Sequence, residues 1–542
     1  AGVKLDMPPG QRYISRYRSV ENNPMQDIYN RIQRRIEELL DGQMEKIKDV
    51  DWVKNNLAFA CETYLGHLRY GTFGSNSIES CHPFLRQSNW MSRNLILAGN
   101  FNMTNTSELI DELVSIGQHP KEQADTVTVM EKIGHFLDQE NDRLKSEADK
   151  NIALNNIQRS QFLIGNIDLP RVMKKAAKAW DGGYAMGGML GQGDSFLIRD
   201  PNGIRPAYYY FNDEIAVVAS ERPVIQTAFN LKFDDIKEVP PGHMIWIKRD
   251  GTVLIKKILE PKKHLACSFE RIYFSRGNDG AIYNERIELG RRLANRVLKA
   301  ANNNFDKTIF SFIPNTAEIS FYGLVKGVES ALNKQKINEV LELKNDFSKE
   351  QLLPILERRP RVEKIAWKDV KLRTFIAQDL VRDDMVSHIY DSTYNIVNPD
   401  DTIVAVDDSI VRGTTLKKSI LKMLDRLGPK KIIIVSSAPQ IRFPDCYGID
   451  MAKMNDFAAF QATISLLKEK GLASIVENTY QQAKAELKKD MLDQINVVTA
   501  IYEPFDDTDI SQKIAQLLTP PGVKAEVQII YQTVKDLHAS CP

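Results

Sequence analysis

The sequence predicts an α/β protein whose second half contains a parallel sheet. An apolar run at 403–406 leads into a polar loop, and a helical pattern begins at Thr414. A second apolar run, 431–438, follows closely, and Gly428 is placed to end the helix between the two runs. Strand, loop, helix and strand in this order form a βαβ unit, in which the two strands run parallel. With 542 residues, the chain is long enough for two or three domains.

Composition and charge exclude several classes of protein. The apolar fraction of 43% and the charged fraction of 26% are ordinary for a globular protein. The net charge of +1 provides no bulk attraction to nucleic acid or to a membrane. No apolar run has the length of a bilayer span, and no signal peptide opens the chain. The five cysteines are far apart, which favours free thiols in a reducing compartment. We therefore expect a cytoplasmic protein without a nucleic-acid or membrane partner.

The loop of the βαβ unit has the composition of a sugar-phosphate site. Ligands of open parallel sheets bind beyond the carboxyl ends of the strands, where this loop lies. The backbone N–H groups of 412–415 are at the start of a helix and can hold a phosphate, and a glycine there lets the backbone come close. Two adjacent carboxylates can accept hydrogen bonds from ribose hydroxyls or help to hold hydrated magnesium. A plain helix-capping turn is the alternative. The residues expected to bind are Asp407, Asp408, Ser409, Arg412, Gly413, Thr414 and Thr415.

The string VDDSIVRGTT at 406–415 resembles the phosphoribosyl pyrophosphate (PRPP) motif of type I phosphoribosyltransferases. It is most similar to the version in the glutamine PRPP amidotransferases, or amidophosphoribosyltransferases, and so is the segment 436–450. The resemblance implies an N-terminal-nucleophile (class II glutamine amidotransferase) αββα domain at 1–258, followed by a type I phosphoribosyltransferase domain at 259–470. We expect a mainly helical extension at 471–542, with a short strand at 496–502, and a helical insertion near 331–368.

This resemblance also implies an activity. Ammonia released from glutamine attacks C1 of PRPP and forms 5-phosphoribosylamine, the first step of de novo purine synthesis. The family match assigns Thr316, Asp407 and Asp408 to a Mg²⁺ site and Arg373 to the loop that closes over PRPP. It further implies a homo-oligomer and purine nucleotides as feedback inhibitors. Some members carry a four-cysteine iron–sulfur cluster, but only Cys267 matches in position and Cys446 is one residue off, so we expect no cluster.

The first half is similar to the glutaminase domain of the same family. The segment 65–75 contains H-x-R-Y-x-T-x-G, and 95–105 is predicted to be a strand that runs into an Asn-rich loop. On this match, the glutamine-binding residues are Arg69, Thr72 and Asp125, and the oxyanion hole is formed by Asn100 and Phe101. Phe101 replaces a glycine of the family, and it still offers a backbone N–H to an oxyanion.

The catalytic residue is the main departure from the family pattern. The family uses an N-terminal Cys that this sequence does not show, so the nucleophile is unknown, and we expect that an N-terminal segment is missing. Cys61 lies in an apolar run typical of a core thiol. Cys81 and His82 are neighbours in an extended stretch, which points their side chains to opposite sides. The alternative function is a PRPP-binding paralogue without glutaminase activity, either ammonia-dependent or regulatory.

Overall fold

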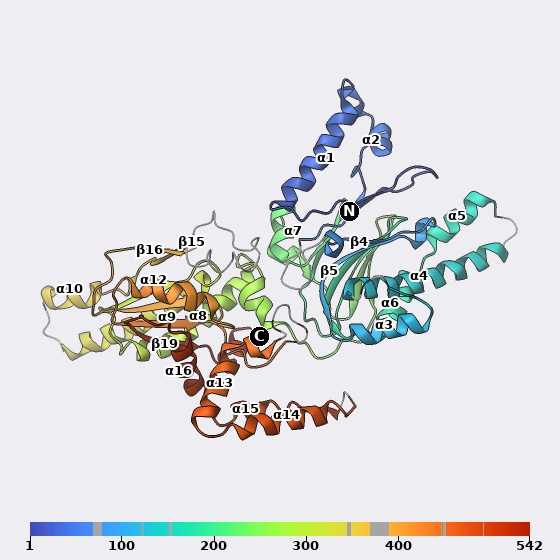
Figure 1. Cartoon of the computed structure of the whole chain (residues 1–542). Helices are drawn as coiled ribbons and strands as arrows, with labels where there is room; N and C mark the ends of the chain where they lie inside the picture. Colours follow the sequence, from blue (N-terminus) through green and yellow to red (C-terminus); the bar gives the residue numbers. More distant parts are fainter. Residues whose placement is uncertain are drawn as a thin grey trace. The chain divides into compact units, whose positions relative to one another are not determined.

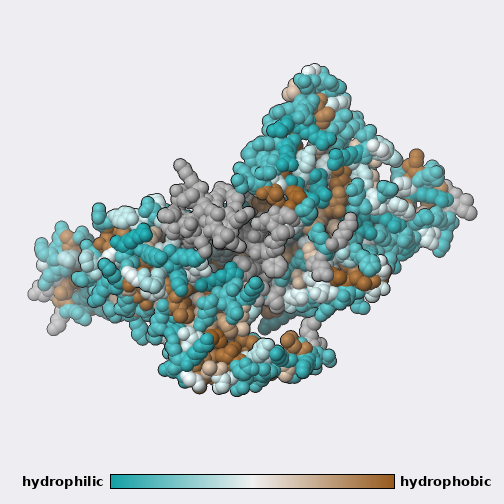
Figure 2. Space-filling view, viewed as in Figure 1, coloured by the Kyte–Doolittle hydropathy of each residue, from teal (hydrophilic) through white to brown (hydrophobic). Residues whose placement is uncertain are grey.

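The computed structural model describes the chain except for residues 69–77, 121, 123, 151–153, 344–347, 369–389, 446, 448–450, 452, 491–492 and 542. The chain divides into two compact units (Figure 1). Unit 1 consists of Ala1–Cys267 and Asp445–Ala452, and unit 2 of Ser268–Pro444 and Lys453–Pro542. Hydrophilic side chains cover most of the face seen in Figure 2. In the part of the chain that the structure describes, no helix has the length and apolar content needed to cross a membrane.

Unit 1 is built on a six-stranded antiparallel sheet in the order β12-β11-β7-β6-β5-β4. Its strands are β4 (Phe84–Arg86), β5 (Leu95–Met103), β6 (Gly182–Leu190), β7 (Ser195–Arg199), β11 (His243–Ile247) and β12 (Val253–Lys257). Apolar residues of this sheet pack with those of helices α3 (Thr106–Ser115), α4 (Asp125–Lys150) and α6 (Leu169–Ala176). The sheet and these helices form the main core of the unit.

One expectation for this sheet is wrong. The segment that was predicted to become an Asn-rich loop remains extended, because β5 continues to Met103 and pairs with β6 over its whole length. Asn100 lies opposite Ala185 and Phe101 opposite Tyr184. The long pairing with β6 overrides the low intrinsic strand preference of Asn and Gly, since tertiary context often decides strand formation.

Smaller elements complete unit 1. A second sheet contains β8 (Tyr208–Phe211), β9 (Ala216–Ala219) and β10 (Lys237–Glu238), with helix α7 (Arg222–Phe229) next to it. A third sheet contains β1 (Gly2–Val3), β2 (Ile14–Ser15) and β3 (Thr63–Tyr64). Between β2 and β3 the chain forms α1 (Pro24–Leu40), the short helix η1 (Met44–Lys48) and α2 (Val50–Asn56), and α5 (Asn156–Gly165) follows α4.

Unit 2 is built on a five-stranded sheet in the order β14-β13-β17-β18-β19, and all of its strands are parallel. The strands are β13 (Thr308–Phe312), β14 (Arg361–Val362), β17 (Thr402–Asp407), β18 (Lys431–Ser436) and β19 (Glu526–Tyr531). The predicted βαβ unit is confirmed: a helix that begins at Thr414 and includes η8 (Leu416–Ile420) and α12 (Leu421–Asp425) connects β17 to β18. Gly428 has the positive φ of +76° that is typical of the residue after a helix.

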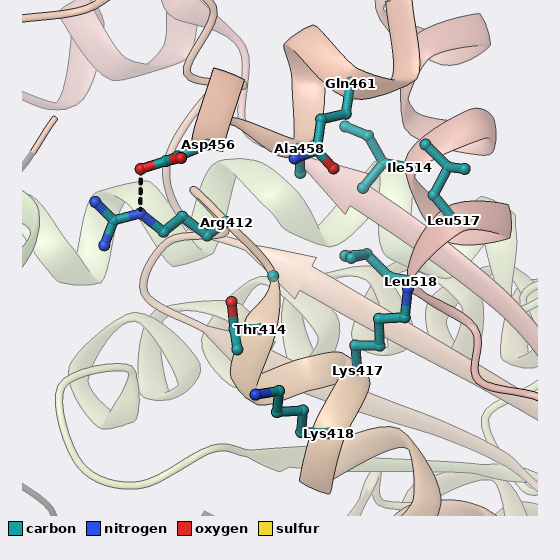
Figure 3. Close-up of a pocket in the computed structure, with 11 residues that line it drawn as sticks. Arg412, Thr414, Lys417, Lys418, Asp456, Ala458, Gln461, Ile514, Leu517 and Leu518 are labelled. Atoms are coloured by element: carbon teal, nitrogen blue, oxygen red, sulfur yellow. Dashed lines mark ion pairs between the residues drawn. The ribbon is translucent and has the colours of Figure 1, made fainter. Parts of the chain in front are cut away.

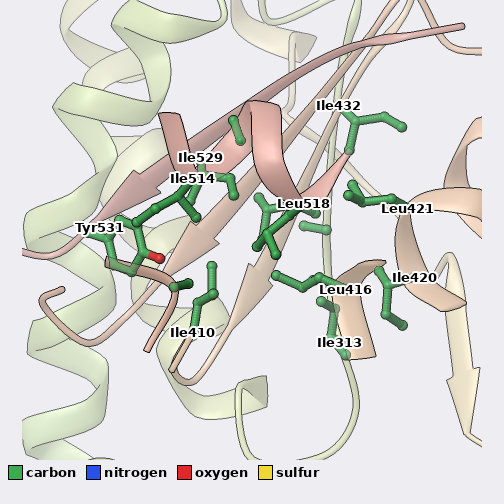
Figure 4. Close-up of a cluster of buried hydrophobic side chains, with 14 of the residues drawn as sticks. Ile313, Ile410, Leu416, Ile420, Leu421, Ile432, Ile514, Leu518, Ile529 and Tyr531 are labelled. Atoms are coloured by element: carbon green, nitrogen blue, oxygen red, sulfur yellow. The ribbon is translucent and has the colours of Figure 1, made fainter. Parts of the chain in front are cut away.

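Helices cover both faces of this sheet, which explains the continuous apolar runs in its strands. Ile403 and Ala405 pack into a core with helices α12, α13 (Ala458–Glu469) and α16 (Asp507–Leu518), part of which Figure 4 shows. The alternate residues Val404 and Val406 pack into a second core with α8 (Gly280–Ala300) and α9 (Glu318–Glu342). Successive strand side chains point to opposite faces, so both cores are needed to bury the strand.

The end of the chain differs from the expectation. Residues 499–502 form helix α15 (Thr499–Tyr502), so the strand predicted at 496–502 is wrong, since short apolar runs do not distinguish strand from helix. The strand of this region is β19, which pairs with β18. The remaining described elements of unit 2 are η6 (Glu270–Phe274), α10 (Lys349–Glu357), β15 (Ala366–Lys368), β16 (Tyr390–Ser392), η9 (Met454–Asp456), α14 (Ser474–Glu486) and α17 (Val534–Ser540).

Candidate functional site

The carboxyl ends of three neighbouring strands bring the predicted site residues of unit 2 together. In the sheet, Phe312 lies opposite Val406, and Asp407 lies opposite Ser436. The chain passes from β13 outward to β14 and then returns to β17 on the other side of β13. The crevice between β13 and β17 is therefore a topological switch point, the usual place of a ligand in an open parallel sheet.

Asp407 and Asp408 lie at this switch point, and hydrogen bonds fix their backbone. Asp408 donates its backbone N–H to the Asp407 carboxylate at 2.9 Å. Ser437, beyond the end of β18, donates its N–H to the Asp407 carbonyl at 3.0 Å and its hydroxyl to the Asp408 carbonyl at 2.9 Å. The Ser409 hydroxyl donates to the Asp408 carboxylate at 2.9 Å. The acidic pair is thus held by two strands and the first residue of the loop.

The electrostatics of the pair favour a cationic or hydroxyl-rich ligand. Burial and the neighbouring Asp408 charge raise the pKa of Asp407 well above its usual range. Burial also raises the pKa of Asp408, against the lowering effect of hydrogen bonds from Ser409 and Thr316 and of the positive charge of Arg286. Two neighbouring carboxylates disfavour each other's ionised form, so a ligand that supplies positive charge or donors relieves the repulsion.

The loop after the acidic pair is anchored on both sides. Ile410 is buried in the core, and the Val411 carbonyl accepts a hydrogen bond of 2.8 Å from the Ala458 N–H at the start of α13. Gly413 has φ of +70°, and a Cβ at this position would lie 2.4 Å from Leu518 Cδ1. The loop therefore needs glycine here for its backbone conformation and for space. Thr414 and Thr415, which begin the helix, are exposed and open to a ligand.

A cavity of about 590 Å³ lies beside this loop (Figure 3). On the loop side it is lined by Arg412, Gly413, Thr414, Lys417 and Lys418, and on the opposite side by residues of α13 and α16. The Arg412 guanidinium lies 3.6 Å from the Asp456 carboxylate, and both side chains are exposed. The cavity wall next to the predicted phosphate loop is therefore cationic.

Two residues near the acidic pair were not predicted. Arg286 on α8 is buried, and its guanidinium donates to the carbonyls of Arg271 at 2.9 Å and Ser275 at 2.8 Å. Burial lowers the pKa of Arg286 to about 10, while Asp408 acts in the opposite direction. Burial, then the charges of Asp407 and Asp408, raise the pKa of Tyr390. The sequence offered one signal for Arg286, which is an arginine on the buried face of an amphipathic helix. It offered no signal for Tyr390.

The donor set fits magnesium that arrives with a phosphorylated ligand. Asp407, Asp408 and Thr316 are oxygen donors, the type that Mg²⁺ prefers, and Mg²⁺ commonly combines one or two carboxylates with substrate phosphates and water. Among the described residues, no group of three or more His, Cys, Asp or Glu side chains is arranged to hold a metal ion. Arg373, assigned to the closing loop, lies outside the described residues.

In unit 1 the structure brings His82 to the residues expected at the oxyanion hole. The Gly99 N–H donates to His82 Nδ1 at 3.2 Å, and Thr126 Oγ1 lies 3.4 Å from His82 Nε2. The His82 ring contacts the Phe101 ring at 6.1 Å between centroids, in a tilted arrangement. Asp125 begins α4 and accepts the Thr126 N–H at 2.7 Å, which places it one residue from the His82 contact. Asn100 and Phe101 lie within β5, whereas Arg69 and Thr72 lie outside the described residues.

The described cysteines are free thiols. Burial raises the pKa of Cys61 to about 11, so this thiol is protonated at neutral pH. The residue is only half-buried, so the prediction of a core thiol is wrong. Cys81 Sγ lies 4.0 Å from the Ser19 carbonyl, whereas His82 faces Gly99 and Thr126. The two neighbours thus contact different groups, as predicted for an extended stretch. Cys446, the second cysteine compared with the cluster pattern, lies outside the described residues.

The parallel sheet, the acidic pair at its switch point and the glycine-containing loop give unit 2 the architecture of a phosphoribosyltransferase-type α/β unit. Curated relatives agree with this class. The chain is 27% identical over 407 residues to the amidophosphoribosyltransferase of Pasteurella multocida, covering 73% of this chain and 69% of the relative. It is 27% identical over 419 residues to the enzyme of Escherichia coli, covering 75% of this chain and 71% of the relative. It is 26% identical over 457 residues to that of Lachancea kluyveri, covering 80% and 77%. No protein-family model matches the chain.

Solved structures show the same fold. The glutamine PRPP amidotransferase from B. subtilis, complexed with ADP and GMP, matches with a TM-score of 0.54 and 21% identity, over 88% of this chain and 77% of that one. A structure described as the allosteric regulatory enzyme of purine biosynthesis matches with a TM-score of 0.56 and 22% identity over the same shares. The predicted resemblance to amidophosphoribosyltransferases is confirmed, and so is the predicted fold class of a glutamine amidotransferase domain followed by a phosphoribosyltransferase domain.

Proposed function

We propose that this chain is an amidophosphoribosyltransferase, which joins ammonia from glutamine to C1 of PRPP and releases pyrophosphate. The observation that carries the proposal is the acidic pair Asp407 and Asp408 at the switch point, followed directly by the anchored loop 409–415. The names of the curated relatives support the same reaction. The proposed function is thus a glycosyl transfer in de novo purine synthesis, in which the glutaminase half supplies the ammonia.

Each part of the loop has a role in this reaction. The N–H groups and hydroxyls of 409–415 hold the 5′-phosphate at the start of the helix. The carboxylates of Asp407 and Asp408 accept hydrogen bonds from the ribose hydroxyls and stabilise positive charge that develops at the sugar as the C1–O bond opens. Arg412 adds positive charge at the phosphate, and Arg373 belongs to the loop that closes over PRPP. When bound, Mg²⁺ neutralises charge on the leaving pyrophosphate, and Thr316 and the acidic pair would help to hold it.

The glutaminase half of the proposal rests on unit 1. Arg69, Thr72 and Asp125 bind glutamine, and Asn100 and the backbone N–H of Phe101 stabilise the oxyanion. The position of His82 against Gly99 supports this placement, because an imidazole nitrogen that accepts the Gly99 N–H fixes this part of the strand. The nucleophile stays unassigned. We also propose a homo-oligomer, regulation by purine nucleotides and a cytoplasmic location; the B. subtilis neighbour was solved with ADP and GMP.

Ammonia alone is expected to drive the transferase half. Attack on C1 requires an unprotonated amine, so the rate with ammonium chloride should rise about tenfold per pH unit toward the pKa of ammonium, roughly 9. The measurement is pyrophosphate release from PRPP at about pH 7.5 and 8.5, with and without magnesium. If PRPP binds but pyrophosphate release does not depend on ammonium, the proposed reaction is wrong.

Substitution of two glycines that share a backbone conformation can distinguish the loop's role in PRPP binding from its contribution to stability. Gly413 and Gly428 have φ of +70° and +76°, but a Cβ on Gly428 would have no neighbour within 4 Å, whereas one on Gly413 would meet Leu518. Gly428→Ala should lower the free energy of unfolding by about 1 kcal/mol and leave the KM for PRPP unchanged. Gly413→Ala should lower the free energy of unfolding further. It should also raise the KM for PRPP at least about tenfold, because the loop 409–415 must move to make room for the new methyl group. An equal KM effect for both variants would contradict the assigned role of the loop.

A further inference from the structure

His82 lies at the place where the pairing between β4 and β5 stops. The two strands are antiparallel, with Phe84 opposite Leu97, and the same register continued by two residues places His82 opposite Gly99. Pro83 stands between His82 and β4 and has no N–H to pair, and the described ladder ends at Phe84. The Gly99 N–H is donated to the side chain of His82 instead, at 3.2 Å from Nδ1.

This hydrogen bond assigns the tautomer of the imidazole. A ring nitrogen that accepts the Gly99 N–H has no proton of its own, so a neutral His82 carries its proton on Nε2. Thr126 Oγ1, in the first turn of α4, lies 3.4 Å from Nε2. His82 therefore accepts a hydrogen bond from β5 with one nitrogen and faces α4 with the nitrogen that donates.

Thr126 extends this contact to Asp125. Thr126 is buried, and its hydroxyl donates to Asp125 Oδ1 at 3.3 Å. The Thr126 N–H donates to the same carboxylate oxygen at 2.7 Å, so the two bonds together set the orientation of the carboxylate. A chain of hydrogen bonds thus runs from the Gly99 N–H through His82 and Thr126 to Asp125. Every donor in it points the same way, and bonds in such a chain strengthen one another.

Neighbouring rings hold the imidazole in this orientation. The His67 ring stacks on it, with 4.4 Å between centroids and 21° between the planes. The Phe84 ring meets it edge-on at 5.2 Å and 86°. Stacked and edge-to-face contacts are the favourable arrangements of aromatic rings. A residue that positions others must itself be fixed by packing, and His82 meets this condition.

We propose that His82 is a positioning residue of the glutaminase half, whose neutral ring links the oxyanion strand to Asp125. Asp125 is assigned to glutamine, and Asn100 and Phe101 to the oxyanion that forms at the side-chain amide. The chain of hydrogen bonds fixes the spacing between these two parts of the glutamine site. The inference rests on the proposed function, because it uses this assignment. Hydrogen bonds in sites without substrate are often long, and these should shorten when glutamine binds.

The test is the binding of L-glutamine to the full chain by titration calorimetry. Binding requires no nucleophile, so the unassigned catalytic residue does not affect the measurement. Thr126→Val removes the hydroxyl but keeps the shape of the side chain, and it should raise the Kd at least about tenfold. Thr126→Ser keeps the hydroxyl and should stay within about threefold of the wild type.

His82→Leu removes both contacts of the imidazole and should also raise the Kd for glutamine at least about tenfold. His135→Leu is the matched control, because His135 lies on α4 and its Nε2 contacts Gln139 Nε2 at 2.9 Å, outside the chain of hydrogen bonds. It should bind glutamine like the wild type. The affinity for magnesium-PRPP, which is assigned to unit 2, should be equal in all variants and shows that they are folded.

A double variant distinguishes a connected chain from two separate structural contacts. In a connected chain His82→Leu already breaks the link, so His82→Leu/Thr126→Val should have about the same Kd as His82→Leu alone. Independent effects would multiply, and the double variant would then bind at least about 100-fold more weakly than the wild type.

Nitrogen NMR of the full chain with isotope-labelled histidine tests the tautomer directly. The His82 signals, identified by their loss in His82→Leu, should show an unprotonated Nδ1 and a protonated Nε2, and both should move when glutamine is added. A proton on Nδ1, wild-type affinity of Thr126→Val or His82→Leu, or multiplied effects in the double variant overturns the positioning role and leaves the proposed function intact. A wild type that does not bind glutamine overturns the glutaminase half, and the positioning role with it.

Discussion

Replacing Asp408 by Asn together with Thr414 by Ala is expected to abolish binding of magnesium-PRPP by the full chain. The first change removes a charge that the proposed ribose contact and the bound metal both need, and the second removes a hydroxyl from the phosphate cradle. A loss of affinity of at least about 100-fold corresponds to roughly 2.7 kcal/mol, within the usual range for removing charge-assisted contacts. Titration calorimetry with magnesium-PRPP measures it directly, and unchanged affinity would refute the assignment of the site.

Asp408→Asn alone should not lower the stability of the protein. Burial raises the pKa values of Asp407 and Asp408, and the charge of Asp408 adds to the rise at Asp407, so the folded protein works against two charges that it keeps for ligand binding. Asp408→Asn relieves this repulsion, and the melting temperature of that single variant should stay equal or rise, as is common at functional sites. Asp400→Asn is the matched control, because Asp400 is an exposed carboxylate just before the same strand, paired with Lys307 at 3.0 Å. It should bind magnesium-PRPP like the wild type.

The loop of unit 2 could be predicted because its chemistry is local. The apolar run, the acidic pair, the glycine and the helix start lie within fifteen residues, and each has its own structural signal. Arg286 and Tyr390 could not be predicted, because they reach the acidic pair from 121 and 17 residues away through the packing of the sheet, α8 and β16. Sequence patterns indicate local structure and do not show which residues distant in sequence come into contact.

The strand errors have the same origin. Residues 99–103 have the composition of a loop, yet their register against β6 keeps them extended. Residues 499–502 have the composition of a strand, yet no strand pairs with them in the described part of the chain, and they form a helix turn. β19 was missed although it completes the parallel sheet on β18. In each case the presence or absence of a partner strand, distant in sequence, decides the local structure.

Replacing Asp200 by Ala is expected to cause the largest loss of stability in unit 1. Asp200 has no exposed surface, and its carboxylate accepts four backbone N–H groups. Oδ1 accepts those of Asn202 and Ile204 at 3.0 Å each. Oδ2 accepts those of Arg205 at 3.1 Å and Tyr184 at 3.3 Å. The side chain thus holds the turn at 201–203 against strand β6.

Alanine at this position leaves several buried N–H groups without an acceptor, at about 1–3 kcal/mol for each, so the free energy of unfolding should fall by about 3–5 kcal/mol. Asp200→Asn keeps one oxygen and two of the four contacts, so it should lose about half as much. Asp213→Ala, an exposed change, should stay within about 0.5 kcal/mol of the wild type.

Urea unfolding followed by tryptophan fluorescence reports mainly on unit 1, since Trp367 is the one tryptophan of unit 2 in the sequence. A shift of less than about 1 kcal/mol for Asp200→Ala would show that the turn satisfies these N–H groups without the carboxylate.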